Sequence, residues 1–442
     1  MNQQKQNGNV IAIIAMCFLF AMISFVTNLA APFGTIWKMQ YVSAGMMGNL
    51  MNFAAYLFMG IPAGKMLVRF GYKKTALTAM AVGVIGLFVQ YLSSIMGATT
   101  ETGITLSDQP LMLNFVIYLL GALICGFCVC MLNTVVNPML NMLGGGGNKG
   151  NQLIQTGGAL NSFSGMLTPL LVGALIGTVS KETSMTDVSP LLFIAMGIFV
   201  LSFLVILFVQ IPEPHLQKGG AAAKVKDAHS PLSFRHCVLG IVGIFLYVGI
   251  EIGIPAQIIF YMSDTTEKGA GIAVNGAAIG GAIAACYWFL MLIGRLISTA
   301  ISSQVSSRAQ LIFASTLAIV LTAIAIFLPK SVTMGVPSFI AAADTQMPVN
   351  VLFLVLCGLC TSVMWGGIFN LAVEGLGKYT AKASGLFMTM VVGGGVMPVI
   401  QESIANAAGY MNSYWLVIAM FAYLLYYGLI GCKNVNKDIP VE

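Results

Sequence analysis

The chain has 442 residues, of which 58% are hydrophobic and only 8% are charged. Roughly a quarter of the residues in a soluble protein are charged, because charge is needed to cover its surface. The composition therefore excludes a soluble globular protein and indicates an integral membrane protein. In that setting the net charge of +6 gives no reason to expect nucleic acid as a partner.

Apolar segments long enough to cross a bilayer follow one another along the chain, since a spanning helix needs about 20 apolar residues. The first group is predicted at 10–36, 44–68, 75–97, 111–143, 152–178 and 189–211. The second group is predicted at 236–262, 272–301, 308–329, 349–373, 381–407 and 411–431. The predicted fold class is an all-α integral membrane protein with 12 transmembrane helices.

The basic residues orient these helices. With the N-terminus placed inside, all but four of the 20 Lys and Arg fall on the cytoplasmic side, the exceptions being Lys38, Lys181, Lys268 and Lys330. Many acidic residues fall outside, namely Glu101, Asp108, Glu182, Asp187, Asp264, Glu267 and Asp344. This asymmetry is the positive-inside pattern, so we expect both termini in the cytoplasm.

The longest polar interruption, "IPEPHLQKGGAAAKVKDAHSPLSFRH", separates the sixth and seventh predicted spans. Its Pro, Gly, Ala and Lys content is typical of a flexible linker. We predict an N-terminal six-helix bundle over 1–212, a cytoplasmic linker over 213–234 and a C-terminal six-helix bundle over 235–442. All three histidines (His215, His229 and His236) lie in or beside the linker, and we expect them to be solvated.

The two predicted bundles repeat one another weakly. The fourth span carries "CGFC" at Cys125–Cys128 and the tenth carries "CGLC" at Cys357–Cys360, and "NPMLNMLG" is matched by "NLAVEGLG" a little further on. Because these matches share nearly one offset, we interpret the halves as parallel six-helix repeats. This is the plan of a secondary transporter whose substrate site lies between the repeats near the midplane.

The paired cysteines also raise the possibility of a metal or redox site. No histidine or acidic ligand accompanies them, although a zinc site needs four ligands. A thiol in apolar surroundings stays protonated and unreactive, and buried cysteine is commonly a small hydrophobic side chain. The sequence therefore predicts neither a metal nor a cofactor.

Polar side chains within membrane spans tend to face the bundle interior or a watery cavity. They are Asn28, Asn49, Asn133, Asn137 and Asn161 in the N-terminal half, and Gln257, Asn370 and Gln401 in the C-terminal half. Amides both donate and accept hydrogen bonds, which suits the hydroxyls of a neutral sugar, and Trp288 or Trp365 could stack on a sugar ring. The alternatives are that the amides fasten helices together and that the indoles only pack.

The segment "YVGIEIGIPAQIIFY" places a carboxylate, Glu251, in an apolar span with no cation nearby in the sequence. Burial penalises the ionised form of a carboxyl group, so one that is protonated when shut away and ionised when wetted can couple proton movement to access. We expect Glu251 to be the proton site, with Glu402 as the rival coupling residue in a wet vestibule. The alternative for Glu251 is a permanently neutral side chain that donates a structural hydrogen bond.

Two further charges, Arg295 and Glu374, lie near the cytoplasmic ends of their predicted spans. A gating ion pair between them and snorkelling of each side chain to the interface are alternatives.

The segment "YLFMGIPAGKMLVRFGYKK" (Tyr56–Lys74) resembles the loop-2/3 signature of the major facilitator superfamily. The resemblance implies that its glycine lets helices two and eleven approach and that its bases line a cytoplasmic gate. The corresponding residues are Gly64, Lys65, Arg69, Gly71 and Lys73. Val68 stands where the family motif usually has an acidic residue, which leaves the usual charge relay without a member.

Other segments resemble the fucose permease and glucose/galactose transporter group: "FLYVGIEIG", "YWFLMLIGRLI", "FNLAVEGLGKYTAKASG", "VVGGGVMPVIQ" and "LNTVVNP" followed by "LNSF". This resemblance implies uptake of a small neutral sugar with a proton across a bacterial inner membrane, by alternating access in a protein expected to be monomeric. The group commonly has a Glu at the position of Glu251. The acidic residues that fucose permeases carry in helices one and four are replaced here by Asn28 and Asn133, so fucose itself is not supported.

Several alternatives stay open. Because Asn28 and Asn133 do not titrate, a facilitative uniporter of the same fold is the main one. An amino sugar could pair its ammonium with Glu251, and sodium could replace the proton. A non-transporting receptor would need an added soluble domain. An enzyme is not expected, because no His–carboxylate cluster, nucleophile motif or phosphate-binding loop is present in the sequence.

Overall fold

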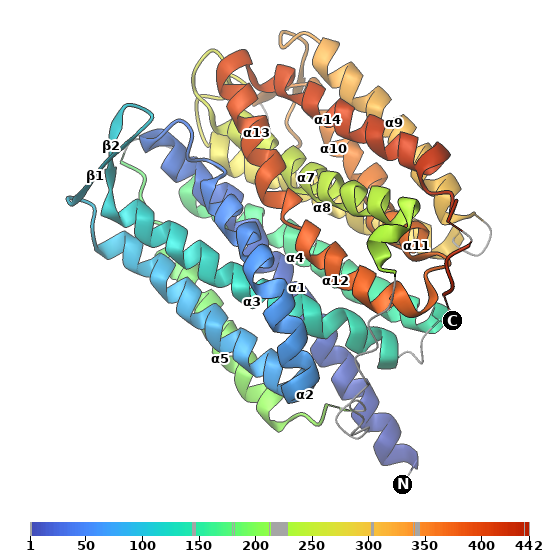
Figure 1. Cartoon of the computed structure of the whole chain (residues 1–442). Helices are drawn as coiled ribbons and strands as arrows, with labels where there is room; N and C mark the ends of the chain where they lie inside the picture. The colour runs from blue at the N-terminus through green and yellow to red at the C-terminus, as the bar shows by residue number, and fades with distance from the viewer. Residues whose placement is uncertain are drawn as a thin grey trace.

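The computed structural model describes residues 2–143, 147–178, 180, 182–211, 213, 229–301, 305–338, 340, 345–436 and 438–441. Helices dominate these residues. The first bundle contains α1 (Asn2–Gln40), α2 (Met47–Ile95), α3 (Leu113–Leu143), α4 (Gly147–Ile176) and α5 (Ser189–Phe208). The second bundle contains α7 (Arg235–Ser263), α8 (Gly276–Ile301), α9 (Ser307–Phe327), α10 (Asn350–Thr361), α11 (Met364–Val373), α12 (Thr380–Met390), α13 (Gly393–Ala408) and α14 (Tyr410–Tyr426). The two bundles lie side by side (Figure 1).

The remaining described elements are short and cover the ends of the bundles. Strand β1 (Glu101–Leu106) pairs antiparallel with β2 (Gln109–Met112), and β3 (Thr333–Gly335) pairs with β4 (Gln346–Pro348). Single helical turns occur at η1 (Pro231–Ser233), η2 (Gly377–Tyr379) and η3 (Tyr427–Gly431). We call the end of the molecule that carries β1 and β2 the hairpin end. The opposite end carries both chain termini, and we call it the terminal end (Figure 1).

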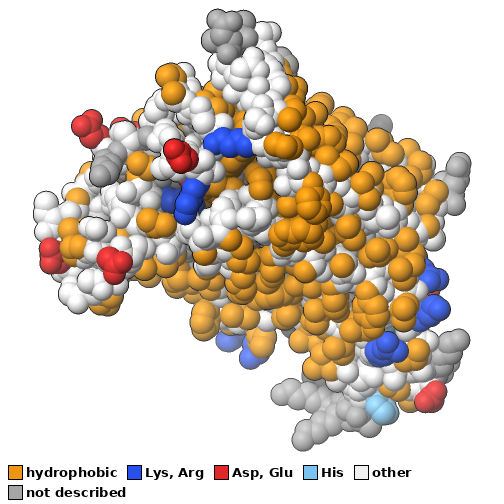
Figure 2. Space-filling model, turned by 90° about the horizontal axis from the view of Figure 1, so that it is seen from above, with side chains coloured by type: hydrophobic (Ala, Val, Ile, Leu, Met, Phe, Trp, Pro, Cys, Tyr) orange, Lys and Arg blue, Asp and Glu red, His pale blue; other side chains and the backbone are white. Residues whose placement is uncertain are grey.

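The predicted arrangement of 12 membrane helices is confirmed. Eleven stretches in the described part of the chain are long and apolar enough to cross a membrane. The remaining predicted span is the part of α2 before Gly71, whose Asn49, Asn52 and Lys65 reduce its apolar character. Figure 2 shows one face of the molecule, on which hydrophobic side chains form a wide area and charged side chains lie toward its margins.

Two of the predicted spans are each built from two shorter helices. The tenth span is α10 followed by α11, and the eleventh is α12 followed by α13. The second of these breaks falls at "VVGGG", where Gly393, Gly394 and Gly395 begin α13. A Cβ atom at Gly393 would meet the backbone of Phe245 in α7, so the glycine allows α13 to approach α7 closely.

Helix α2 changes direction at Gly71, whose φ of 86° is a conformation that glycine adopts readily and other residues do not. The helix that restarts after Gly71 is capped by the Glu213 carboxylate, which accepts hydrogen bonds from the amides of Tyr72 (2.9 Å) and Lys73 (2.8 Å). The Lys73 ammonium donates to Leu207 O and Val209 O at the end of α5. Gly71 and Lys73 of the signature segment therefore fix the turn between the second and third spans.

The predicted linker, residues 213–234, lies mostly outside the described residues, as does His215. His229 is exposed as expected, but the prediction is wrong for His236, which is fully buried. His236 begins α7, and its Nε2 lies 2.9 Å from Glu374 O in the loop after α11. The side chain is buried because that loop and η3 pack over the start of α7.

The turn at Gly71 generates a prediction about stability. We expect Gly71→Ala to destabilise the protein by about 1–2 kcal/mol, because an L-residue is strained at positive φ, and because its Cβ would press on the Glu213 carboxylate that caps the helix. Gly64→Ala, in the same segment, is the control, since a Cβ there meets nothing within 4 Å. Thermal unfolding in detergent compares the two. A Gly71→Ala melting temperature equal to that of Gly64→Ala would contradict this account of the turn.

Candidate functional site

A small cavity lies between the two bundles. It is lined by Thr27, Asn28 and Ala31 of α1, Asn49 of α2, Pro169 of α4, Ile252, Pro255, Ala256 and Ile259 of α7, and Ala284 and Trp288 of α8. Its volume of about 10 Å³ is roughly what one water molecule needs. Any larger occupant therefore requires the bundles to move apart.

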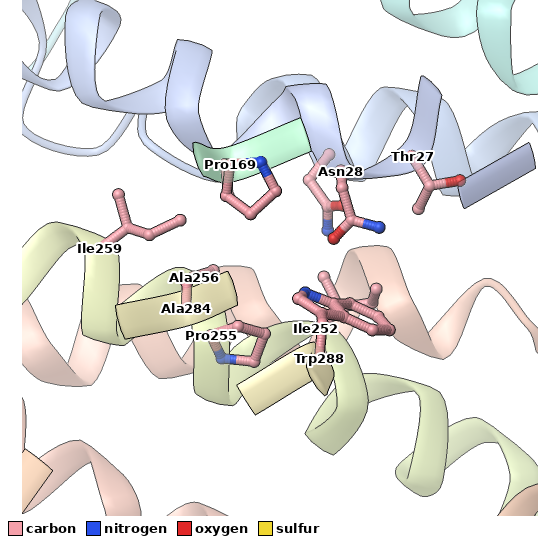
Figure 3. A pocket seen from close by; sticks show the side chains of 11 residues that line it. Thr27, Asn28, Pro169, Ile252, Pro255, Ala256, Ile259, Ala284 and Trp288 are labelled. Atoms are coloured by element: carbon pink, nitrogen blue, oxygen red, sulfur yellow. The ribbon is translucent and has the colours of Figure 1, made fainter. Parts of the chain in front are cut away.

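Asn28 and Trp288 face each other across this cavity (Figure 3). The Asn28 amide nitrogen donates to Ser24 O (2.9 Å) and Ser24 Oγ (3.1 Å) on its own helix, which holds the side chain in place. Trp288 is 3% exposed, and its ring lies against Gly165 of α4, where a Cβ would come within 3.0 Å of the indole. The cavity thus combines an oriented amide with a fixed aromatic face, one from each bundle.

Glu251 is not isolated, contrary to the sequence-based expectation. Its Oε1 lies 3.3 Å from Nη2 of Arg295, and the two side chains are only 13% and 12% exposed. The other end of the guanidinium donates to Gly158 O of α4 at 2.6 Å. Arg295 therefore links the carboxylate on α7 of the second bundle to a main-chain carbonyl of the first bundle.

The predicted gating partner of Arg295 is corrected by the same geometry. Glu374 is exposed at the end of α11, where its backbone carbonyl meets His236, and Arg295 pairs with Glu251. Of the other predicted gate residues, Lys65 and Arg69 are exposed and Gly64 is partly exposed, whereas Gly71 and Lys73 form the turn within α2.

Aromatic side chains accompany Glu251. Tyr247 precedes it by one helical turn and is fully buried. The ring of Trp365 in α11 lies 6.2 Å from that of Tyr247, centroid to centroid. Trp365 thus lies beside the Glu251 region and does not line the cavity with Trp288.

Two of the predicted sugar-binding amides join helices of the first bundle, and a third bonds within its own helix. Asn133 of α3 donates to the Tyr56 hydroxyl of α2 at 2.7 Å, and Asn161 of α4 donates to Phe20 O of α1 at 3.0 Å. Asn137 donates to Asn133 O one turn earlier at 3.1 Å. None of the three lines the cavity, and the interhelical bonds of Asn133 and Asn161 favour the helix-fastening alternative for those two.

Two other amides are buried along the contact between α7 and α13. Gln257 is 0% exposed, and neither atom of its amide has a partner among the described residues. Gln401 donates weakly to Ser413 Oγ (3.4 Å), and its Oε1 lies over Gly253, one turn before Gln257. A buried amide without partners costs about 1–3 kcal/mol, which marks Gln257 as a side chain suited to a ligand. Asn370 is exposed near the end of α11, apart from these groups.

Glu402 does not face a wet vestibule, since it is 1% exposed. Its carboxylate lies 3.6 Å from Nζ of Lys38 and accepts hydrogen bonds from the backbone amides of Gly45 (3.0 Å) and Met46 (2.8 Å) at the start of α2. Lys38 was predicted to lie outside the membrane spans, on the external side, and its pairing with Glu402 was not predicted. One signal was available: Lys38 is one of only four bases on the acid-rich side.

Contacts between the bundles gather at the hairpin end. Besides the Glu402 contacts, Asn49 donates to Gly394 O, and Asn406 donates to Val42 O at 3.1 Å. The amide of Ala277 at the start of α8 donates to Gly177 O at the end of α4 (3.1 Å). The described part of the protein is therefore in a conformation that is closed at its hairpin end.

Comparison with known proteins places the chain among membrane transporters. The family model described as "Major Facilitator Superfamily" matches residues 11–398. A "Glucose/galactose transporter" of Brucella abortus is 28% identical, covering 98% of this chain and 96% of that protein. The "L-fucose-proton symporter" of Escherichia coli is 23% identical, covering 92% of this chain and 89% of that protein. A crystal structure of the E. coli fucose:proton symporter matches with a TM-score of 0.66 at 19% identity, covering 95% of this chain and 98% of that one.

The buried Arg295–Glu251 pair yields a prediction about stability that separates the effect of charge from that of packing. Arg295→Met should destabilise the protein by about 3 kcal/mol, because it leaves Glu251 buried without its cation. Adding Glu251→Gln to Arg295→Met should restore most of that loss, because the uncompensated charge is removed. Thermal unfolding of the two single variants and the double variant measures the coupling. Strictly additive effects would contradict an ion pair of this kind.

Proposed function

The chain belongs to the major facilitator superfamily, and we propose that this member is a symporter that imports a small neutral, hexose-type sugar together with a proton. The observation that carries the proposal is Glu251, an intramembrane carboxylate that directly precedes Ile252 on α7. Ile252 lines a cavity that an amide and an indole from opposite bundles also line. Relatives named as a glucose/galactose transporter and as a fucose–proton symporter support the class of substrate.

The chemistry of the cavity suits a neutral sugar. A sugar presents hydroxyls that need both donors and acceptors and a ring face that is apolar, which matches an amide such as Asn28 together with the Trp288 indole. Gln257 does not line the cavity in this conformation, but it follows the cavity-lining Pro255 and Ala256 on α7 and carries a buried amide without a partner among the described residues. An anionic substrate is disfavoured because the nearby guanidinium, Arg295, is already paired with Glu251.

The coupling step follows from the contacts of Arg295. While Glu251 is ionised, the guanidinium is held between this carboxylate and Gly158 O of the opposite bundle. A proton on Glu251 removes the attraction that orients the guanidinium, and so weakens a tie between the two bundles. We propose that this exchange between an ion pair and a neutral acid links proton binding to the movement of the bundles. Glu402 is the rival coupling residue, and sodium is the alternative coupling ion.

Closure of the hairpin end supports alternating access to the site. The proposed orientation places the terminal end, with both termini, in the cytoplasm of a bacterial inner membrane, as the distribution of bases predicts. In that orientation the structure is closed to the outside, and the cavity must open there to receive sugar. We propose that the unit of transport is the monomer, since the cavity is formed within one chain.

A facilitative uniporter is the second candidate, favoured by one observation. Asn28 and Asn133 stand where acidic residues are expected in fucose permeases, and neither amide titrates. Uptake by a uniporter would only equilibrate sugar and would be indifferent to an uncoupler.

Glu251→Gln tests the coupling role. In proteoliposomes the variant should retain sugar counterflow, because exchange of bound sugar needs no net proton movement. Accumulation driven by a pH gradient should be lost, because the side chain no longer binds and releases a proton. Radiolabelled glucose and galactose report both activities.

The matched control is Glu374→Gln, which removes an exposed carboxylate outside the site and should accumulate sugar like wild type. If Glu251→Gln still accumulates sugar on a proton gradient, the assignment is wrong and Glu402 becomes the next residue to test. If wild type itself never exceeds equilibrium, the protein is a uniporter.

Gln257→Leu distinguishes a ligand-binding amide from a structural one. Because the amide makes no hydrogen bond in the described structure, replacing it with an apolar side chain should leave the melting temperature unchanged or slightly higher. Sugar affinity should fall about tenfold, as the loss of one buried hydrogen bond predicts. Equilibrium sugar binding and thermal unfolding are measured on the same samples. Lost stability with unchanged affinity would assign Gln257 to packing.

A further inference from the structure

At the hairpin end, one charged contact engages both bundles reciprocally. Glu402 belongs to α13 of the second bundle, and its carboxylate meets only first-bundle groups among its polar contacts described here: Lys38 Nζ and the amides of Gly45 and Met46. Those amides belong to the two residues directly before α2, of which Met46 is the N-cap, and the helix dipole favours an anion there. Glu402 therefore caps a helix that belongs to the other bundle.

Lys38 reaches in the opposite direction. It lies near the end of α1 in the first bundle, and its ammonium is placed over two aromatic rings of the second bundle. The Lys38 nitrogen is 4.7 Å from the centroid of Phe260 and 5.2 Å from that of Tyr410. Such cation–π contacts are strongest where water is excluded, and the Lys38 side chain is only 15% exposed.

The space between the bundles at this point is fully used. A Cβ at Gly45 would collide with the Glu402 carboxylate and with the Phe260 ring, so the loop between α1 and α2 docks directly on the second bundle. Glu402 and Lys38 cannot keep these partners when the bundles separate at the hairpin end. Separation would leave two amides, an ammonium and a carboxylate to be hydrated, whereas the neighbouring Asn49 and Asn406 contacts each involve one neutral hydrogen bond.

We propose that Lys38 and Glu402 are positioning residues for transport, forming a latch that holds the hairpin end shut and that must be broken for the site to open there. The proposal rests on alternating access as proposed above, and it assigns Glu402 a role distinct from proton coupling. The latch sets the ratio of the closed to the open state at this end, and the sugar contacts lie elsewhere, around the cavity.

The test is a distance measurement in nanodiscs without sugar. Spin labels are attached to cysteines introduced by Thr105→Cys and Thr265→Cys. These positions are exposed, one in each bundle, at the hairpin end. All nine native cysteines are buried or half-buried, which favours labelling at the introduced sites. Double electron–electron resonance should show mainly a short distance in the unsubstituted background. Glu402→Ala should raise the ratio of long- to short-distance populations about tenfold, since bonds to a charged acceptor are strong.

Three variants make the result specific. Glu402→Asp, which keeps the charge, should recover part of the short-distance population. Lys38→Met should shift the ratio in the same direction as Glu402→Ala while leaving the helix cap intact, and it serves if Glu402→Ala fails to fold. Tyr410→Phe is the matched control, because it removes a hydrogen bond to Asp264 (3.1 Å) within the second bundle but keeps the ring under Lys38. It should leave the ratio unchanged.

Unchanged distances in folded Glu402→Ala and Lys38→Met would overturn the latch. Equal shifts in Tyr410→Phe would also overturn it, since they would show general loosening of this end. Because the distances are measured without sugar or a proton gradient, failure of the latch is distinguishable from failure of the proposed symport. In transport assays the latch variants should keep both counterflow and gradient-driven accumulation, with a changed rate of counterflow. Loss of a coupling residue abolishes accumulation, and loss of the fold abolishes both.

Discussion

A charge within the hydrocarbon region of a membrane needs a partner, and this requirement shapes the interior of the protein. The described residues contain two such pairs, Arg295 with Glu251 and Lys38 with Glu402. In each pair one member also bonds to the main chain of the opposite bundle: Arg295 to Gly158 O, and Glu402 to the amides of Gly45 and Met46. The charges that the membrane disfavours are therefore placed where the two bundles meet.

This placement gives the two pairs different consequences for movement. The Arg295–Glu251 pair lies on α7 and α8, the two helices of the second bundle that line the cavity. A change of charge on the pair therefore alters the electrostatic environment of helices that would contact a substrate. The Lys38–Glu402 pair lies beyond the cavity, beside the glycine that lets the loop between α1 and α2 dock. One pair thus suits coupling and the other suits gating, although both are carboxylates matched to a base.

The number and type of helices could be predicted from the sequence, because hydropathy follows from composition over each span. Intramembrane polar residues also identified Asn28, Trp288 and Glu251 as candidates, and the structure brings these to the cavity or its margin. Which amide lines the cavity and which joins two helices was not predictable, because Asn133 and Asn161 differ from Asn28 only in the neighbours that the fold supplies. The sequence pattern predicts which face of a helix carries a polar side chain. Whether that side chain lines a cavity or bonds to another helix depends on which helix packs against that face.

The pairing of Glu251 was missed for a related reason. Its cation is 44 positions away in sequence, and the two side chains meet only because α7 and α8 pack together. Lys38 was assigned to a loop because a base close to the end of an apolar run usually lies at the interface. The burial of His236 likewise depends on the loop after α11, which the sequence does not place.

Proton coupling at Glu251 is tested most directly by recording the pH of a weakly buffered medium when sugar is added to cells or proteoliposomes without an imposed gradient. Sugar entry should draw protons with it, so the medium should become more alkaline with wild type and its pH should stay unchanged with Glu251→Gln. Entry of radiolabelled sugar through wild type without any alkalinisation would contradict proton coupling at Glu251 and would establish a uniporter or another coupling ion.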